Sequence, residues 1–249
     1  MRLAGKTAIV TGGASGFGEG IVRRFAEEGA NVIIADINDS LGGKVASDIG
    51  STCLYSHCDV TSQADLTAAA KLATDRFGRL DIMVNNAGMP QTNQPMLDVD
   101  EDTFQKIFDV NVKSIFLAAK AVVPIMREQG SGSIINTASS AALRPRPGLV
   151  WYNASKGAAT TMTKAMAIEL APDQIRVNAL CPVAGETPML GAFMGGEITN
   201  EMRATFISTI PMGRFSTPRD MANAALFFAS DESAFITGVC MEVDGGRCI

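Results

Sequence analysis

The stretch Thr11–Gly18 reads TGGASGFG; it ends the β-branched apolar run Thr7–Thr11 and opens an amphipathic segment. A glycine-rich turn between a strand and a helix is typical of a dinucleotide-binding βαβ unit. Gly12 permits the tight turn, Gly16 lets the backbone approach a pyrophosphate, and Gly18 lets the helix pack close to the strand. The helix N-terminus presents free N–H groups and its positive dipole end to the anion. The expected cofactor contacts in this stretch are Gly12, Ser15, Gly16, Phe17 and Gly18.

The alternation of strand and helix continues along the chain and predicts a doubly wound α/β fold. Runs that are apolar almost throughout, such as NVIIA at 31–35, suit parallel strands covered on both faces. The segment Glu19–Glu28 shows helical periodicity, with Ile21, Val22 and Phe25 on one face, and Gly29 ends it. The expected strands are Thr7–Thr11, Asn31–Asp36, Thr52–Cys58, Leu80–Asn85, Ser133–Ala138, Ile175–Cys181 and Val239–Val243.

One segment breaks this alternation. Residues 185–216 form a long Met- and Gly-rich insertion between an expected strand and the next helix. Long insertions in a compact domain are usually active-site lids or disordered, and the apolar content here favours an ordered lid over the substrate. No linker divides the rest, so we expect one domain over residues 1–249.

The composition excludes several classes of protein. The chain has 249 residues and a formal net charge of −5, which argues against a nucleic-acid partner. No apolar run is long enough to span a membrane, and the N-terminus lacks a signal-peptide core. The five cysteines form no CxxC pair and there is one histidine, so we expect reduced thiols, a cytoplasmic protein and no metal site. The charged fraction of 19% is low and indicates surface hidden in an oligomer.

Two acidic residues at strand ends bear on the cofactor. Asp36 ends the second expected strand, where a carboxylate binds the adenine-ribose hydroxyls and repels a 2′-phosphate. Because no Arg or Lys lies near it, NAD is favoured over NADP. Asp59 and Val60 follow the third strand and are candidate contacts to the adenine. Both aspartates have an alternative role as helix caps.

A tyrosine, a lysine and a serine form the candidate chemical site. Tyr152 and Lys156 lie four residues apart in YNASK, which places them on one face of a helix. A phenol with an ordinary pKa near 10 is a weak acid or base at neutral pH, and a neighbouring ammonium lowers that pKa. Ser139 ends the preceding strand, where its hydroxyl can meet Tyr152 above the sheet.

Taken together, these motifs resemble the short, single-domain branch of the short-chain dehydrogenase/reductase family. The resemblance covers nearly the whole chain and adds NNAG at 85–88, NVKS at 111–114 and DGG at 244–246. It implies a Rossmann-type fold with a seven-stranded parallel sheet, usually in a homotetramer. It also implies an NAD(P)-dependent enzyme that acts on CH–OH groups.

The resemblance assigns roles to individual residues. Tyr152 matches the general acid/base, Lys156 the residue that holds the nicotinamide ribose, and Ser139 the hydroxyl that orients the substrate oxygen. Asn111 matches the residue that holds a helix distortion and a water in the proton relay. Further cofactor contacts are implied at Asn86, Ala87, Gly88, Pro182 and Thr187.

One position departs from the family pattern. Val183 follows Pro182 where the family often has glycine. A valine there would narrow the pocket or shift the backbone, and Gly185 is a candidate to restore flexibility.

The substrate site is expected between the loop after Ser139 and the lid. Its mainly apolar walls suit a ketone or secondary alcohol, with Arg144 and Arg146 as either ligands of an anionic group or a solvated or intersubunit pair. The expected substrate contacts are Ser139, Tyr152, Leu143, Trp151, Met189 and Phe193.

These observations predict an NAD-dependent oxidoreductase that interconverts a secondary alcohol and a ketone. A reductase of 3-oxoacyl groups on acyl carrier protein or CoA is the alternative. The helix ends that flank the cleft, at 128–130 and 172–174, carry no basic patch for an acidic carrier. A non-catalytic NAD(H)-sensing regulator is the remaining alternative, but such proteins commonly lose the tyrosine or lysine.

Overall fold

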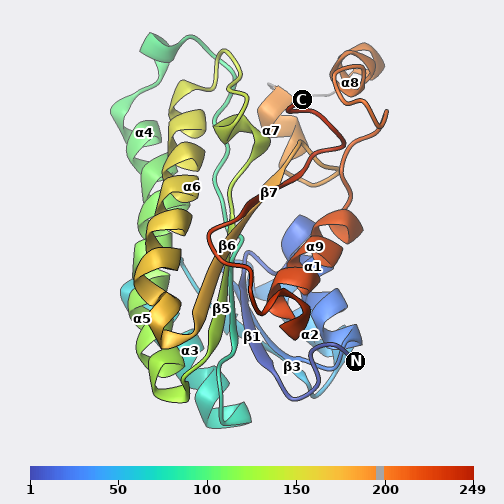
Figure 1. Cartoon of the computed structure of the whole chain (residues 1–249). Coiled ribbons are helices and arrows are strands. Elements are labelled where there is room, and N and C mark those ends of the chain that lie inside the picture. The colour runs from blue at the N-terminus through green and yellow to red at the C-terminus, as the bar shows by residue number, and fades with distance from the viewer. Residues whose placement is uncertain (195–198) are drawn as a thin grey trace.

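Seven parallel strands form one sheet in the computed structural model of the chain, which describes residues 1–194 and 199–249 (Figure 1). The strand order is β3-β2-β1-β4-β5-β6-β7, so the direction of winding reverses between β1 and β4. In a doubly wound sheet this reversal opens a crevice at the carboxyl ends of the strands. The strands are β1 (Thr7–Thr11), β2 (Asn31–Asp36), β3 (Cys53–His57), β4 (Ile82–Asn85), β5 (Gly132–Thr137), β6 (Ile175–Pro182) and β7 (Cys240–Val243).

All seven expected strands are present, and the doubly wound Rossmann-type fold is confirmed. β1 and β2 have the predicted bounds, and the other strands differ by one or two residues at their ends. Leu80 is buried but lies outside β4, because its N–H and carbonyl pair with the Gln129 side chain instead of a neighbouring strand. Burial alone therefore placed the start of this strand two residues too early.

Helices cover both faces of the sheet (Figure 1). On one face α1, α2 and α9 pack over a core that includes Ile21, Phe25 and Phe228; on the other, α3, α5 and α6 cover Ile9, Met83 and neighbouring residues. The helices are α1 (Gly16–Glu27), α2 (Asp39–Ile49), α3 (Gln63–Phe77), α4 (Glu101–Phe108), α5 (Ser114–Gln129), α6 (Val150–Leu170), α7 (Leu190–Met194), α8 (Asn200–Ile207) and α9 (Pro218–Ala229). Within the described residues, no helix combines the length and apolar character that a membrane span requires.

The two ends of the 185–216 segment lie next to each other. A backbone bridge joins Gly185 to Ser216, and the Glu186 N–H donates to the Ser216 carbonyl at 3.0 Å. Between these ends lie α7 and α8, while residues 195–198 of the expected lid fall outside the described residues. Val183 packs against this segment in a buried cluster with Phe206 and Phe215, so the valine fills apolar space at its base.

Candidate active site

A cavity of about 550 Å³ opens at the carboxyl ends of the central strands. A volume of 300–1,000 Å³ is usual for small-molecule and cofactor sites. Most of the residues selected from the sequence line this cavity: Gly12, Ser15, Gly16, Phe17, Asp36, Asp59, Val60, Asn86, Ala87, Gly88, Ser139, Tyr152, Lys156, Pro182, Thr187, Met189 and Phe193.

The glycine-rich turn at one end of the cavity has the steric features that its sequence predicts. Gly12 and Gly16 adopt left-handed backbone conformations, with φ of 62° and 56°. A Cβ on Gly18 would lie 2.0 Å from the Gly12 carbonyl oxygen, so no side chain fits between helix α1 and the turn. Gly18 therefore shapes the turn from behind, without lining the cavity.

Thr11 and Asn86 hold this turn against β4. The Thr11 hydroxyl accepts hydrogen bonds from the N–H groups of Asn86 and Ala87 and donates to the Val84 carbonyl. The Asn86 amide donates to the carbonyls of Thr11 and Gly12, at 2.9 and 3.2 Å. Thr11 was missed as a separate site residue, because a threonine at a strand end gives no sequence signal of its partners.

Asp36 lies at the end of β2 and lines the cavity. Its carboxylate accepts from the N–H groups of Ala14 and Asn38, at 3.0 and 2.9 Å, which fixes it beside the glycine-rich turn. The cap of helix α2 is Asn38, whose side chain accepts from the Leu41 N–H. The alternative role of Asp36 as that helix cap is therefore wrong.

Asp59 does not cap a helix either, so its alternative role is also wrong. Helix α3 is capped by Ser62, whose hydroxyl accepts from the Asp65 N–H at 3.3 Å. The Asp59 carboxylate instead accepts from the N–H and hydroxyl of Thr61, both at 2.8 Å. Asp59 and Val60 line the same end of the cavity as Asp36.

Tyr152 is buried near the start of α6, with only 7% of its surface exposed. Burial raises the pKa of its phenol to about 12, while hydrogen bonding by Ser139 and the charge of Arg146 lower that pKa. The sequence pattern predicts that Lys156 lowers this pKa, and the structure adds Arg146 as a second cation whose charge lowers it. The Phe193 ring meets the Tyr152 ring edge-on, with 5.0 Å between centroids.

Lys156 lies on the same face of α6 and is also buried. Its ammonium donates to the Thr137 carbonyl at 2.8 Å, and lies 5.8 Å from the centre of the Tyr152 ring. Burial lowers the pKa of Lys156 to about 8. Gly88 faces this ammonium, since a Cβ at that position would lie 3.5 Å from it.

Asn111 lies in η2 (Asp109–Lys113), a π-helical turn between α4 and α5. Its amide donates to the Met89 carbonyl and the Ser155 hydroxyl, at 2.9 and 3.0 Å, and its oxygen accepts from the Met89 N–H. Asn111 does not line the cavity; it lies behind Gly88, 3.4 Å from the position of a Cβ there. The residues 88–89 therefore separate Asn111 from the cavity.

Gln91 positions the start of helix α6 and was missed from the sequence. Its side-chain oxygen accepts from the backbone N–H groups of Trp151 and Tyr152, at 3.1 and 3.0 Å. Its amide donates to the Gly148 carbonyl. Because the first N–H groups of a helix need partners from outside it, Gln91 serves as a cap supplied by a distant loop.

Two expected substrate contacts are corrected by the structure. Trp151 does not line the cavity: its ring packs edge-on against Phe104 and its Nε1 donates to the Met96 carbonyl. Successive helical residues point about 100° apart, so the face that turns Tyr152 into the cavity turns Trp151 away from it. Leu143 is 44% exposed and also lies outside the cavity lining.

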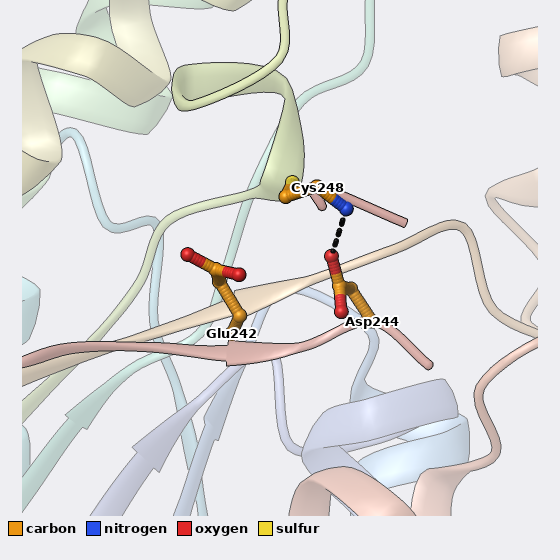
Figure 2. Close-up of side chains that lie close together, drawn as sticks. All are labelled: Glu242, Asp244 and Cys248. Carbon is orange, nitrogen blue, oxygen red and sulfur yellow. Dashed lines mark hydrogen bonds between the residues drawn. The ribbon is translucent and has the colours of Figure 1, made fainter. Parts of the chain in front are cut away.

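The C-terminal turn brings another residue to the cavity. The Asp244 carboxylate accepts from the N–H groups of Gly246 and Cys248, at 2.9 and 2.8 Å, and thereby folds the turn that carries Arg247. Figure 2 shows the bond from the Cys248 N–H. Glu242 lies beside it, so three possible metal-ligand atoms are grouped here. Both Asp244 oxygens already accept backbone hydrogen bonds, and this accounts for the buried carboxylate.

The residues around the cavity fit a nicotinamide dinucleotide. Gly12 and Gly16 have no side chain and lie at the N-terminus of helix α1. This arrangement is one that binds a pyrophosphate. A Cβ on Gly16 would lie 3.3 Å from the Thr187 side chain, so the turn and the 185–216 segment face each other across a narrow gap.

Comparison with known proteins agrees with this geometry. A family model described as Enoyl-(Acyl carrier protein) reductase matches residues 12–247. A solved structure of a 3-ketoacyl-(acyl-carrier-protein) reductase from Brucella melitensis, complexed with NADH, superposes with a TM-score of 0.94. It is 46% identical and the match covers 99% of this chain and 100% of that one.

Similar proteins have several different activities. A 4-formylbenzenesulfonate dehydrogenase of Comamonas testosteroni is 46% identical, with 100% of both chains covered. A 2,5-dichloro-2,5-cyclohexadiene-1,4-diol dehydrogenase of Sphingobium indicum is 40% identical, over 98% of this chain and 97% of its own. A 3-oxoacyl-[acyl-carrier-protein] reductase of Thermotoga maritima is 38% identical over 100% of both.

Proposed function

The chain belongs to the short-chain dehydrogenase/reductase family and is an NAD(P)-dependent oxidoreductase of CH–OH groups; on that premise we propose that it interconverts a secondary alcohol and a ketone with NAD. The observation that carries the proposal is the buried Tyr152 phenol, with Ser139 beside it and Lys156 one helical turn away, in a cavity that fits a dinucleotide.

Tyr152 and Ser139 have different roles at the substrate oxygen. Tyr152 takes the hydroxyl proton in the oxidising direction and returns it to the developing alkoxide in the reducing direction. Ser139 donates a second hydrogen bond to that oxygen, and one such donor is worth about 2.7–4 kcal/mol in the transition state. When bound, the nicotinamide ring supplies the carbon that accepts or releases the hydride.

Lys156 and Asn111 support the proton transfer. Lys156 holds the nicotinamide ribose and stabilises negative charge on the phenol, from a position fixed by the Thr137 carbonyl. Asn111 fixes the π-helical turn and residue 89, and holds water for the relay on the far side of Gly88. Asn86, Ala87, Pro182 and Thr187 complete the contacts to the cofactor.

Asp36 sets the preference for NAD over NADP. Its carboxylate is fixed by Ala14 and Asn38 at the end of the cavity where the adenosine binds, with Asp59 and Val60 nearby. A carboxylate there accepts hydrogen bonds from ribose hydroxyls and repels a 2′-phosphate. The NADH bound in the similar Brucella melitensis structure supports this preference.

The second candidate is reduction of 3-oxoacyl groups on acyl carrier protein or CoA. Relatives named for this activity match the full chain, which is the observation in its favour. The complete Tyr152, Lys156 and Ser139 set argues against a non-catalytic NAD(H) sensor.

We also propose a homotetramer in the cytoplasm. Phe116 and Ile168 are exposed on α5 and α6, at 53% and 79%, and these two helices are the proposed dimer interface. The structure contains five free cysteines, and unpaired thiols are usual in a reducing compartment. Light scattering coupled to gel filtration tests the assembly, and a monomer would contradict it.

The test of the function is a panel of substrates followed by the absorbance of reduced nicotinamide. It includes aliphatic and aromatic ketones with their alcohols, acetoacetyl-CoA and 3-oxoacyl groups on acyl carrier protein, each with NAD(H) and NADP(H). We expect turnover of free ketones with NADH, lost in Tyr152→Phe. Faster turnover of the carrier-bound substrates would favour the second candidate, and NADH binding without any turnover would favour the sensor.

A further inference from the structure

Three arginines line the substrate end of the cavity: Arg144, Arg146 and Arg247. They come from two places far apart in the sequence, the loop between β5 and α6 and the C-terminal turn. The Arg144 guanidinium donates to the Arg247 carbonyl at 2.6 Å and so joins the two places. These two segments thus supply basic side chains near the cleft, which the helix ends at 128–130 and 172–174 lack.

Arg146 is the innermost of the three. It is half-buried, and burial together with the charge of Arg247 lowers its pKa. Arg146 and Tyr152 line the same cavity, and the charge of Arg146 lowers the pKa of the Tyr152 phenol. The Phe206 ring lies 4.7 Å from the guanidinium carbon, within the range of a cation–π contact.

None of the three guanidinium groups has a carboxylate partner within 4.0 Å among residues 1–194 and 199–249. Other arginines near this region do have one: Arg203 pairs with Glu186 and Arg214 with Asp220. Partly buried charges are normally paired because their desolvation is costly. Among the described residues, the three guanidinium groups are therefore available to bind an anionic ligand.

The loop that carries Arg146 is held in place. The Asn153 amide donates to the Arg146 carbonyl at 2.8 Å, and the Asn93 amide donates to the Pro147 carbonyl at 3.1 Å. Gly148 accepts from both the Gln94 N–H and the Gln91 amide. The backbone that carries Arg146 is thus held in place before ligand binds, which lowers the cost of ordering it on binding.

Between Arg146 and Tyr152 the walls are apolar and aromatic. Phe193 lies against Tyr152, Phe206 lies against Arg146, and Ala141 and Leu149 complete this part of the lining. Such walls suit a planar ring, which buries its faces and edges against aromatic side chains.

We propose that Arg146, assisted by Arg247 and Arg144, is an anion subsite, and that the substrate is an aromatic carbonyl compound or alcohol with a carboxylate or sulfonate group. This inference rests on the proposed function, because the anion binds at one end of a substrate whose reacting oxygen meets Tyr152. A small molecule is favoured over an acidic carrier protein because Arg146 is half-buried and lines the same cavity as Tyr152.

The first experiment compares ketones that differ in charge. The substrates are 4-acetylbenzenesulfonate, 4-acetylbenzoate and neutral 4-methylacetophenone, each assayed with NADH. We expect kcat/KM to be about 10- to 100-fold higher for the charged ketones, the factor for a hydrogen bond to a charged group. Arg146→Met should remove most of this advantage, with Arg146→Lys intermediate, while the neutral ketone loses much less.

The matched control is Arg219→Met, which removes an exposed arginine of α9 that pairs with Glu27 away from the cavity. It changes the net charge equally and should leave the ratio of charged to neutral turnover unchanged. Equal kcat/KM for charged and neutral ketones, or equal losses on both in Arg146→Met, would overturn the subsite while the proposed function stands.

A binding measurement separates the two proposals. Calorimetric titration of benzenesulfonate and benzoate into the enzyme with NADH should show binding that is lost in Arg146→Met and kept in Arg219→Met. If this holds while no alcohol or ketone is turned over, the subsite stands and the proposed function fails. If neither anion binds, the subsite fails. Faster turnover of a carrier-bound 3-oxoacyl group, reduced by Arg144→Met, would also overturn it in favour of a protein partner.

Discussion

The two ends of the cavity are built in different ways. At the cofactor end, neighbouring strands deliver short stretches of backbone, and glycines decide what fits: a Cβ at Gly18 would lie 2.0 Å from a carbonyl oxygen. At the substrate end, side chains from the β5–α6 loop, the 185–216 segment and the C-terminal turn meet around Phe206 and Arg146. The steric limits on a local backbone turn can be predicted from the sequence. Contacts between side chains that are far apart in the chain cannot.

Because of this difference, variants at the two ends of the cavity should lose activity in different ways. Damage at the cofactor end should weaken NADH binding and therefore slow the turnover of every substrate. Damage at the substrate end should change which molecule is accepted while NADH still binds. The following four experiments test that separation.

The largest effect is expected at Gly18. Gly18→Ala forces a Cβ against the Gly12 carbonyl and the Asn86 amide, so the turn must shift. Overpacking costs typically about 1–3 kcal/mol, and we expect NADH affinity, measured by fluorescence, to fall up to about 100-fold. The control is Gly43→Ala on α2, where a Cβ meets nothing within 4 Å. It should leave NADH binding intact and stabilise the fold slightly; equal affinities for both variants would contradict the steric argument.

The next effect concerns Asp36. Asp36→Ala removes the carboxylate proposed to bind the ribose hydroxyls, and a hydrogen bond to a charged group is worth about 1.5–3 kcal/mol. We expect kcat/KM with NADH to fall about 30-fold while that with NADPH rises or holds. Steady-state kinetics with both cofactors measure this. A variant that keeps the full preference for NADH would show that Asp36 only supports the turn through Ala14.

A smaller effect is expected at Gln91, which holds the start of α6. Gln91→Ala leaves the N–H groups of Trp151 and Tyr152 without their acceptor, and an unpaired buried donor costs about 1–3 kcal/mol. Urea unfolding should show reduced stability, and kcat should fall several-fold with little change in NADH affinity. Gln91→Glu keeps the acceptor and should be intermediate in kcat. Wild-type kcat in Gln91→Ala would show that the start of α6 needs no external cap.

The smallest effect is a shift in the pH dependence. Ser139 and Arg146 both lower the pKa of the Tyr152 phenol against the larger effect of burial. Oxidation needs the deprotonated phenol, so kcat/KM for the alcohol rises with pH. Removing a cation that favours the phenolate should move the midpoint of this rise upward in Arg146→Met. The Arg219→Met profile should stay on that of the wild type, and a downward shift in Arg146→Met would reverse the proposed electrostatics.

The sequence predicted the elements that local rules determine. β1 and β2 have their predicted bounds, and the glycine-rich turn has its left-handed residues where the spacing required them. The π-helical turn at 109–113 had no recognisable pattern of its own in the sequence. Only the resemblance pointed to a distortion at Asn111.

The substrate end was predicted less well for a physical reason. Trp151 adjoins Tyr152 in the chain, yet one helical step turns it toward Phe104. Arg247 lies 103 residues from Arg144, and their contact depends on how the C-terminal turn folds over the loop. The contacts of Gln91 could not be predicted for the same reason, since its partners lie about sixty residues further along the chain. Such contacts follow from the tertiary structure and have no local signature.

The most direct test of the account measures two quantities on one variant, Tyr152→Phe: the affinity for NADH and the rate of ketone reduction. The phenol hydroxyl belongs to the chemistry and not to the glycine-rich turn, so NADH affinity should stay within a few-fold of the wild type. The rate should fall by about 10²–10⁴, the contribution of general acid–base catalysis. A variant that retains wild-type turnover would contradict the assignment of Tyr152, and one that loses NADH binding with turnover would contradict the separation of the two ends.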